Sequence, residues 1–427
     1  MVDLRNIFQS PFWHKYKTLF FVWILMVVIS VGLHMHNFNN FLIYKYTFWH
    51  AYNGTSLYAA YPEDHYDVNH YGPIYGLIMA PFAIIPSLWA GVFFWHLALA
   101  LFLWWAIRRS TLTWEQQVII FWFTAHEMLN ALGMSQFNVA TAAMILLSYT
   151  YLRRGSEMWS AFWIVLGTLT KIYGIVGLAF FFFAKSKPKF VLWLVVWSVV
   201  LFVLPMPFWG CGYVVDQYAE WATSLLAKGD ENILSDFQNI SLLGFVRKVG
   251  YACTAGLSAY YDVFWRRTLP DASNWWIAVW SDLWIILPGL LYGALPYLRI
   301  RQYGSLSFQM MCLASVLMFV NIFSTGSENS SYIISMLGVG IWYVAVPWKR
   351  SRTDLWLMIF CFFLTSLSPT DLFPEYLRTH WIRPFALKSI PVVVIWLKLV
   401  YEMLTKDYTK DINPDYDTQE DTLLLVE

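Results

Sequence analysis

Charged side chains are scarce in this 427-residue sequence, in which Asp, Glu, Lys and Arg make up 13% and apolar residues 59%. A soluble chain of this length would form two or three domains with charged surfaces, so the composition excludes that class. The net charge is only +1, and a surface for nucleic acid is therefore not expected. The sequence instead indicates a polytopic membrane protein that is surrounded by lipid.

Cysteine is equally scarce, and Cys211, Cys253, Cys312 and Cys361 lack the paired spacing of zinc or redox sites. A bridge between Cys211 and Cys253 is possible if both lie outside, but nothing near them fixes the geometry that a disulfide needs. The chain also lacks the repeated pair of broken helices that transporters use. A cleavable signal peptide is not expected, because the first apolar run is itself a span.

Long apolar runs, by contrast, are abundant. Runs that suffice to cross a hydrocarbon core, ~20 residues as helix, recur from residue 18 to residue 404. We therefore expect an all-α bundle of about twelve transmembrane helices, with outer-face loops and short amphipathic helices. The expected spans lie near residues 18–36, 88–107, 117–133, 138–152, 158–170, 173–184, 190–209, 275–297, 306–324, 332–347, 354–368 and 387–404.

One apolar segment, residues 73–86, is short and carries three prolines. We expect it to be a re-entrant or surface helix, because a full crossing there would place the next basic cluster outside.

Basic residues predict the orientation, because Lys and Arg beside membrane spans remain on the cytoplasmic side. With twelve spans, all five basic clusters lie on the same side as the basic N-terminal segment. Residues 1–404 are then a single membrane domain with both ends in the cytoplasm, and residues 405–427 are a disordered tail. The outer loops are residues 37–72, 210–274 and 368–386.

The first outer loop is dense in carboxylates, imidazoles and aromatic rings, among them Glu63, Asp67, His70 and Tyr71. These residue types can hold a sugar and move a proton. We expect the apolar segment that follows to shield Asp67 partly, so that its carboxylate accepts a proton from a sugar hydroxyl. The simpler interpretation is an ordinary interfacial loop, since Trp and Tyr collect at the headgroup level.

Lys171 lies between two apolar segments with almost no loop around it. Its ammonium is therefore expected at the membrane boundary, where a lipid phosphate is its natural counter-ion. A lysine that only extends to the headgroups is the alternative. Its position on the outer face, against the usual bias of basic residues, favours a functional role.

Other polar residues are candidates in their own contexts. His126 and Glu127 lie within an expected span, where an ionisable residue suggests a functional site. The turn that follows carries the amides of Gln136 and Asn138, which can bind hydroxyls. Further candidates from the later outer segments are Asn239 and Ser241, ahead of an amphipathic surface helix, and Glu328.

In their order and spacing, these motifs resemble glycosyltransferase family 87 over roughly residues 35–345. The resemblance implies a GT-C-type membrane enzyme. Such an enzyme moves a mannose-like hexose, or a pentose, from a polyprenyl-phosphate sugar to a glycan or glycolipid acceptor on the outer face, with inversion. It also implies a bacterial inner membrane. The motifs are Asn40-x-x-x-Tyr44, His70-Tyr71-Gly72-Pro73, Ser135-Gln136-Phe137-Asn138, Gly167-x-x-x-Lys171-x-Tyr173 and Asn239-Ile240-Ser241.

The resemblance also implies roles for individual residues. Family members usually carry Asp, thought to be the catalytic base, where this chain has Asn40, so we expect Asp67 or its neighbour Glu63 to replace it. Lys171, with Tyr173 and His70, would bind the donor phosphate. No cofactor is expected, and a divalent metal is left open. The residues expected to bind sugar or acceptor are Tyr44, Tyr71, His126, Glu127, Gln136, Asn138, Asn239, Ser241 and Glu328.

Two other classes of function compete with this interpretation. A secondary transporter or lipid flippase could use His126 and Glu127 as a coupling site, although it would also need polar groups on the inner face, where few are expected. A non-catalytic envelope assembly protein is the other alternative, because the amide of Asn40 cannot accept a proton.

Overall fold

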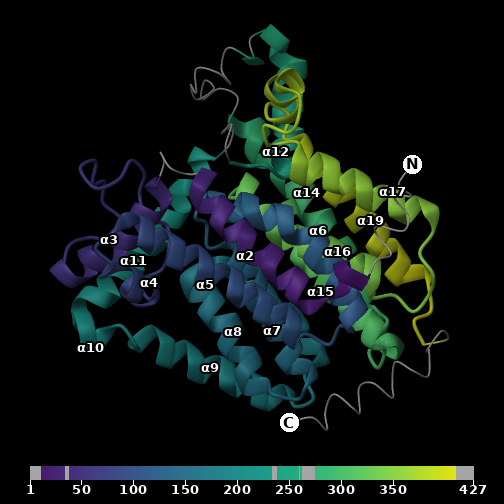
Figure 1. Cartoon of the computed structure of the whole chain (residues 1–427), viewed down its shortest axis with the longest axis horizontal. Helices are drawn as coiled ribbons and strands as arrows, with labels where there is room; N and C mark the ends of the chain where they lie inside the picture. Colours follow the sequence, from purple (N-terminus) through teal and green to yellow (C-terminus); the bar gives the residue numbers. More distant parts are fainter. Residues whose placement is uncertain (1–10, 34–37, 233–237, 259, 262–274, 410–427) are drawn as a thin grey trace. The chain divides into compact units, whose positions relative to one another are not determined.

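The computed structural model describes residues 11–33, 38–232, 238–258, 260–261 and 275–409, and these ranges contain helices and no strands. Figure 1 shows the helices with their labels. The contacts divide the chain into two compact units. The N-terminal unit comprises Met1–Tyr151, Glu157–Ile175 and Pro188–Ser224; the C-terminal unit comprises Leu152–Ser156, Val176–Lys187 and Leu225–Glu427.

The N-terminal unit is built on a long apolar helix, α2, which packs against α5 and α6. The indole of Trp23 on α2 donates to the carbonyl of Ala100 on α5 at 2.8 Å, and its ring meets Phe121 of α6 edge to face. The helices along this part of the chain are α2 (Tyr16–Leu33), α3 (Asn39–Asn53), α4 (Tyr75–Ala83), α5 (Leu88–Arg109), α6 (Trp114–Gly133), α7 (Asn138–Arg153), α8 (Glu157–Thr170), α9 (Lys187–Val203), α10 (Met206–Trp209) and α11 (Cys211–Glu231).

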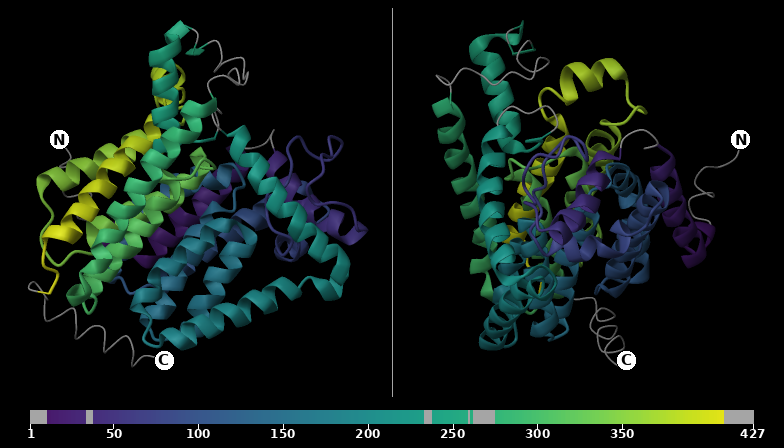
Figure 2. Two further views of the ribbon diagram at one scale, coloured as in Figure 1. Left: turned by 180° about the vertical axis from the view of Figure 1, so that it is seen from behind. Right: turned by 90° about the vertical axis from the view of Figure 1, so that its left-hand side faces the viewer.

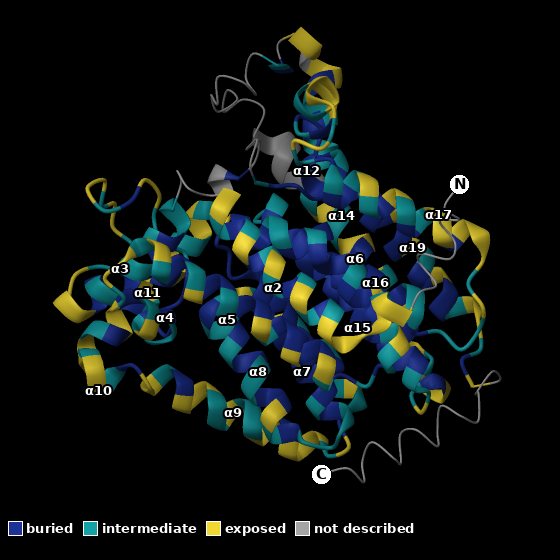
Figure 3. Ribbon diagram, viewed as in Figure 1, coloured by how far each residue is buried: buried dark blue, intermediate teal, exposed yellow. Residues whose placement is uncertain are grey.

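The C-terminal unit has its core in α15 and α16, in which most residues are buried (Figure 3). Its last helix, α19, packs on α15, and the helical segment Glu375–Ile382 is bent by 90° from α19 (Figure 2). The main helices from this part of the chain are η2 (Ile172–Phe183), α12 (Leu242–Ala255), α14 (Trp275–Ala294), α15 (Leu306–Ile322), α16 (Tyr332–Val344), α17 (Arg352–Cys361), α18 (Glu375–Leu377) and α19 (Ile390–Thr405).

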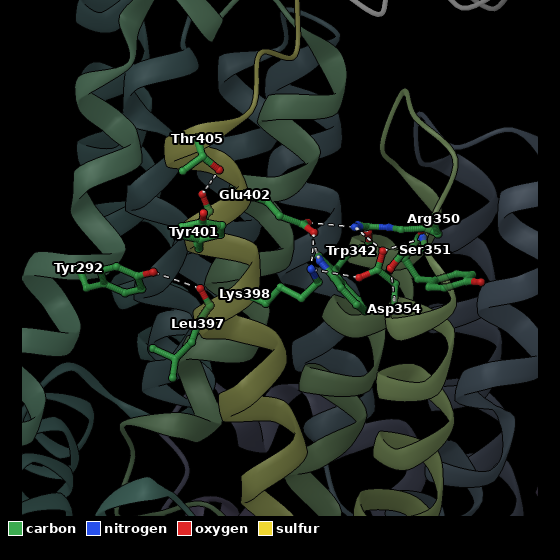
Figure 4. Close-up of polar contacts among 11 residues, drawn as sticks. Tyr292, Trp342, Arg350, Ser351, Asp354, Leu397, Lys398, Tyr401, Glu402 and Thr405 are labelled. Atoms are coloured by element: carbon green, nitrogen blue, oxygen red, sulfur yellow. Dashed lines mark hydrogen bonds and ion pairs between the residues drawn. The ribbon is translucent and has the colours of Figure 1, made fainter.

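A buried ionic network joins three helices of the C-terminal unit (Figure 4). Glu402 of α19 accepts from Arg350 at 2.9 Å and lies 3.1 Å from the ammonium of Lys398. Lys398 also lies 3.2 Å from the carboxylate of Asp354, and the guanidinium of Arg350 covers the ring of Trp342. Two cations face two carboxylates, so the network holds α19 to α16 and α17 with its charges balanced.

Each of the twelve segments that we predicted as spans contains helix within its described residues. Fewer of them meet a strict criterion of length and apolarity. Three helical segments in the described ranges are long and apolar enough to cross a membrane, namely Tyr16–Leu33, Leu88–Arg109 and Lys187–Trp209. A fourth is added if Glu375–Ile382 and Leu387–Thr405 form one bent span. The prediction of about twelve spans is therefore not confirmed, whereas the all-α class is.

The first outer segment differs from the loop that we expected, because residues Asn39–Asn53 form helix α3. Phe41, Tyr44, Thr47 and Ala51 are buried along one face of α3, which packs on α4. The helix ends at Gly54, whose φ of 69° closes it in the left-handed conformation that glycine favours. The density of polar residues concealed this amphipathic pattern.

Two smaller predictions concern residues 73–86 and the cysteines. Helix α4 lies within residues 73–86 and has only nine residues, too few to cross a membrane alone, and its re-entrant or surface placement stays a prediction. The possible bridge between Cys211 and Cys253 is absent, since both cysteines are free and exposed. The predicted tail lies largely outside the described residues, which end at position 409.

Candidate functional site

Two phenols and one amide form a buried network in the N-terminal unit. The hydroxyls of Tyr44 and Tyr71 both donate to Oε1 of Gln136, at 3.0 and 3.1 Å, and lie 3.1 Å from each other. The ring of Tyr71 stacks on Tyr75, with centroids 4.4 Å apart. Since Tyr44 comes from α3, Tyr71 from the following loop and Gln136 from the turn after α6, the network joins three segments that are distant in sequence.

Lys171 extends this network with a positive charge. Its ammonium donates to Oδ1 of Asn138 at 2.8 Å and to the hydroxyl of Tyr71 at 3.4 Å. It also lies 5.3 and 5.4 Å from the ring centroids of Tyr71 and Tyr173, at distances typical of cation–π contacts. Lys171 is half-buried. The structure therefore brings together six of the residues that we predicted for the site from separate motifs.

Gly72 accounts for the close approach of the Tyr71 loop to Lys171. Its backbone N–H donates to the carbonyl of Thr170, the last residue of α8, at 3.1 Å. A Cβ at position 72 would lie 1.9 Å from the carbonyl oxygen of Leu169, so any residue other than glycine would force the two segments apart. The loop and the end of α8 are thus joined directly beside the ammonium.

The backbone of the Tyr71 loop is held from several sides. Asn69 accepts from the Tyr71 N–H at 3.0 Å and donates to the Tyr71 carbonyl at 3.2 Å. The hydroxyl of Tyr58 donates to the same carbonyl at 2.9 Å. Two residues of α11 complete the support, because Trp221 donates to the carbonyl of His70 at 2.8 Å and Ser224 lies 2.9 Å from its Nδ1.

The residues predicted for the site did not include Tyr58, Asn69, Trp221 or Ser224. The spacing of Gln217, Trp221 and Ser224 along α11, four and then three residues, is a helical signal that could have identified its buried face. Tyr58 and Asn69 act through hydrogen bonds to the backbone of another residue, which no sequence pattern reveals.

The carboxylates of the first outer segment do not lie as we expected. Asp67 is exposed, and its Oδ1 accepts from the N–H of Val68 at 2.8 Å, so the expected shielding by the following apolar segment is wrong. Glu63 is exposed as well. The carboxylate that meets an imidazole is Asp64, which lies 3.3 Å from Nε2 of His50. Burial lowers the pKa of His50, although Asp64 acts in the opposite direction.

Asn40 has a defined partner on the turn that carries Gln136. Its side-chain amide donates to the carbonyl of Met134 at 2.8 Å. A carboxylate could not make this contact, because an ionised carboxylate only accepts hydrogen bonds. Asparagine at position 40 therefore serves as a donor to the backbone of the turn.

Among the other predicted residues, His126 and Glu127 lie on α6. Glu127 is fully buried and accepts from Asn130 at 2.9 Å, whereas His126 is half-buried. In the C-terminal unit, the fully buried Asn239 accepts from Ser241 at 2.8 Å. Ser241 caps the N-terminus of α12.

Glu328, also in the C-terminal unit, caps a short 3₁₀ turn and accepts from Ser330 at 3.3 Å. The side-chain contacts of Asn239, Ser241 and Glu328 given above are with near neighbours in the sequence, whereas the Asn239 N–H donates to the carbonyl of Thr325 at 3.0 Å. A role of these residues in substrate binding stays a prediction. Within the described ranges, no group of three His, Cys, Asp or Glu residues is arranged to hold a metal ion.

The apolar helices, together with this polar network around a half-buried cation, define a helical membrane protein. Residues 69–324, more than half of the chain, match the model of glycosyltransferase family 87. The chain belongs to this family and is a membrane glycosyltransferase, as the order of its motifs predicted. A search of curated proteins finds no match. The matched region includes Tyr71, Gln136 and Lys171.

Proposed function

We propose that this protein transfers either a mannose-like hexose or a pentose from a polyprenyl-phosphate sugar to a lipid-linked or glycan acceptor. The reaction takes place on the outer face of a bacterial inner membrane, and both termini lie in the cytoplasm. The proposal rests on the family and on one observation, the environment of Lys171. The residues around this ammonium fit a phosphate better than they fit a structural ion pair.

The contacts of Lys171 are with neutral groups. In the described part of the chain its ammonium meets the amide oxygen of Asn138, the hydroxyl of Tyr71 and two aromatic rings, and no carboxylate lies within 4.0 Å. A half-buried cation without a counter-charge is costly, and an anionic ligand removes that cost. A lipid phosphate at the membrane boundary supplies this charge.

The chemistry that follows is a single displacement. The oxygen of an acceptor hydroxyl forms a bond to the anomeric carbon from the face opposite the phosphate, so the configuration inverts. The bond from that carbon to the phosphate oxygen breaks with its electron pair, and Lys171 stabilises the charge on the departing polyprenyl phosphate. Tyr173 and His70 assist at the phosphate, while Tyr44 and Tyr71 contact the sugar.

The proton of the acceptor hydroxyl passes to a carboxylate, for which we propose Asp67. Asp67 is exposed on the segment that leads directly into the Tyr71 loop, where an acceptor from outside can reach it. Its backbone carbonyl lies 2.5 Å from Nδ1 of His65, a buried residue, which anchors the position of this exposed carboxylate. Glu63 is the alternative base on the same segment.

The test is sugar transfer by purified protein from a radiolabelled polyprenyl-phosphate mannose, with a membrane extract as the acceptor source. Lys171→Ala should lower kcat by roughly 10²- to 10³-fold, the usual effect of removing a group that stabilises transition-state charge. Asp67→Asn should lower it by roughly 10²- to 10⁴-fold. Asp216→Asn and Lys187→Ala, which change exposed charges on α11 and α9, are the matched controls and should retain activity.

Full activity in both Asp67→Asn and Lys171→Ala would overturn these roles. A folded parent protein that transfers sugar from no polyprenyl-phosphate donor would instead favour the non-catalytic assembly protein.

A further inference from the structure

The turn that carries Gln136 is held by side chains from two other helices of the same unit. Asn40 of α3 donates to the carbonyl of Met134 at 2.8 Å, and the indole of Trp95 on α5 donates to the carbonyl of Ser135 at 3.0 Å. The next residue of α5, His96, lies with Nε2 2.9 Å from Oγ of Ser135. Three side chains thus converge on the two residues that precede Gln136.

The backbone of this turn needs such support. Ser135 has a φ of 53°, in the left-handed region that a residue with a Cβ seldom adopts. A strained residue of this kind persists only where its surroundings hold it in place. Ser135 is buried, and both its carbonyl and its hydroxyl are bound by residues of α5.

The hydrogen bonds around His96 define which of its nitrogens carries the proton. On the other side of the ring, Nδ1 lies 2.9 Å from Oγ of Ser30 on α2, and the hydroxyl of Ser30 donates its single hydrogen to the carbonyl of Val27 at 2.7 Å. Ser30 can therefore only accept from His96, so Nδ1 is protonated. In a neutral ring Nε2 is then an acceptor, and the hydroxyl of Ser135 donates to it.

His96 is fully buried within an apolar helix, where burial of an imidazole costs free energy unless both ring nitrogens form hydrogen bonds. Ser30 and Ser135 provide these two hydrogen bonds. His96 therefore connects α2 and α5 to the turn. Through the turn it also connects them to the side-chain amide of Gln136, which accepts hydrogen bonds from the hydroxyls of Tyr44 and Tyr71.

We propose that His96, together with Asn40 and Trp95, positions Gln136 and thereby the Tyr71 hydroxyl that contacts Lys171. His96 is a positioning residue, because it acts through Ser135 and the turn and not on the substrate. The expected effect on sugar transfer rests on the function proposed above, whereas the expected effect on the structure of the turn does not.

Two substitutions separate positioning from general packing. In His96→Gln the side-chain oxygen reaches the place of Nε2 and can accept from Ser135. In His96→Asn the shorter amide occupies the place of Nδ1, so it keeps the contact with Ser30 and loses the contact with Ser135. Both variants remove the imidazole ring from the core, and each is therefore the control for the other.

Hydrogen exchange of full-length protein in lipid nanodiscs, measured by mass spectrometry, reports on the turn without any substrate. His96→Asn and Ser135→Ala should each raise exchange of the amides at 134–138 by about tenfold, the value of one lost hydrogen bond, and His96→Gln should not. Because both changes remove the same bond, the double variant His96→Asn/Ser135→Ala should exchange no faster than either single variant.

Transfer from polyprenyl-phosphate mannose is the second readout. His96→Asn should lower kcat by roughly 10- to 100-fold through displacement of the network, with His96→Gln close to the parent. If His96→Asn does not fold, Asn40→Asp replaces the donor to Met134 with an acceptor at a half-buried position and should raise exchange in the same way.

Equal behaviour of the Gln and Asn variants at position 96, or unchanged exchange at 134–138 in every variant, would overturn the proposal. Raised exchange in His96→Asn with no transfer by the parent would count against the proposed function and leave the positioning of the turn supported.

Discussion

The network around Gln136 and the network around Glu402 are both buried and polar, yet their charges are arranged differently. Around Glu402 two cations face two carboxylates, and each charged group has a partner of opposite sign (Figure 4). Around Gln136 the charged group is Lys171, and its partners in the described ranges are neutral. The first network is complete as it stands, whereas the second has one positive charge that its own residues do not neutralise.

This difference favours a structural role for the network around Glu402 and fits the binding role that we propose for the network around Gln136. A balanced network needs nothing from outside and holds helices together, and removal of one partner leaves another charge buried without compensation. An unbalanced cation in a half-buried place is instead suited to a ligand of the opposite charge. Substitutions in the two networks should accordingly affect different properties, stability in one and activity in the other.

The largest effect is expected at Glu402. Glu402→Gln removes the carboxylate that accepts from Arg350 and lies beside Lys398, and the buried guanidinium loses its main partner. The free energy of unfolding should fall by about 3–5 kcal/mol, as for other broken buried ion pairs. Thermal unfolding in detergent measures this loss. A Glu402→Gln protein that unfolds at the same temperature as the parent would remove the contrast between the two networks.

A smaller effect is expected when either phenol is removed, and the effect should differ between Tyr44→Phe and Tyr71→Phe. Tyr44→Phe removes one hydrogen bond to Gln136, with an expected cost of about 0.5–1.5 kcal/mol in transition-state stabilisation. Tyr71→Phe removes the bond to Gln136 and also the contact with Lys171. The loss of kcat/KM should therefore be greater for Tyr71→Phe, and the KM for the polyprenyl-phosphate donor should rise in this variant alone. The reverse order would argue against Lys171 as the phosphate-binding group.

The smallest effect is a pH dependence outside both networks. Burial lowers the pKa of His50 from its ordinary value of 6.5, so the unfolded chain binds a proton more readily than the folded one. The stability from this group is therefore fully present above pH 6.5 and declines as the pH falls below it. Thermal unfolding between pH 5 and pH 8 should show this slope in the parent, with a weaker slope in His50→Gln. An unchanged slope in the variant would assign it to other groups.

Apolar runs predicted where most of the apolar helices lie, because length and hydropathy are local properties of the chain. The 21-residue helix α11 falls within the expected outer loop 210–274 and was not predicted. Helix α3 escaped prediction, since its buried stripe of Phe41, Tyr44 and Thr47 lies among polar residues that resemble a loop. The number of crossings is not confirmed, because fewer helices meet a strict criterion of length and apolarity. Helix α15, for example, has 17 residues.

The residues of the network around Lys171 could be singled out from the sequence, whereas their contacts could not. Lys171, Gln136 and Tyr71 were separate candidates, and only the folded chain shows that they form one network. The exposure of Asp67 could not be foreseen, because it depends on how the loop after α3 packs. His96 gave no signal at all, since one histidine in an apolar run looks like any core residue until its two serine partners are known.

Gly72 has a consequence for how the specificity of this enzyme can be altered. The Tyr71 loop and the end of α8 touch at a point where there is no space for even one methyl group, and a backbone hydrogen bond closes the same joint. Lys171 and Tyr71 are therefore held close to each other by direct contact between the backbones that carry them. Attempts to widen the sugar specificity should leave this joint intact and vary exposed positions beside Asp67, such as Tyr66.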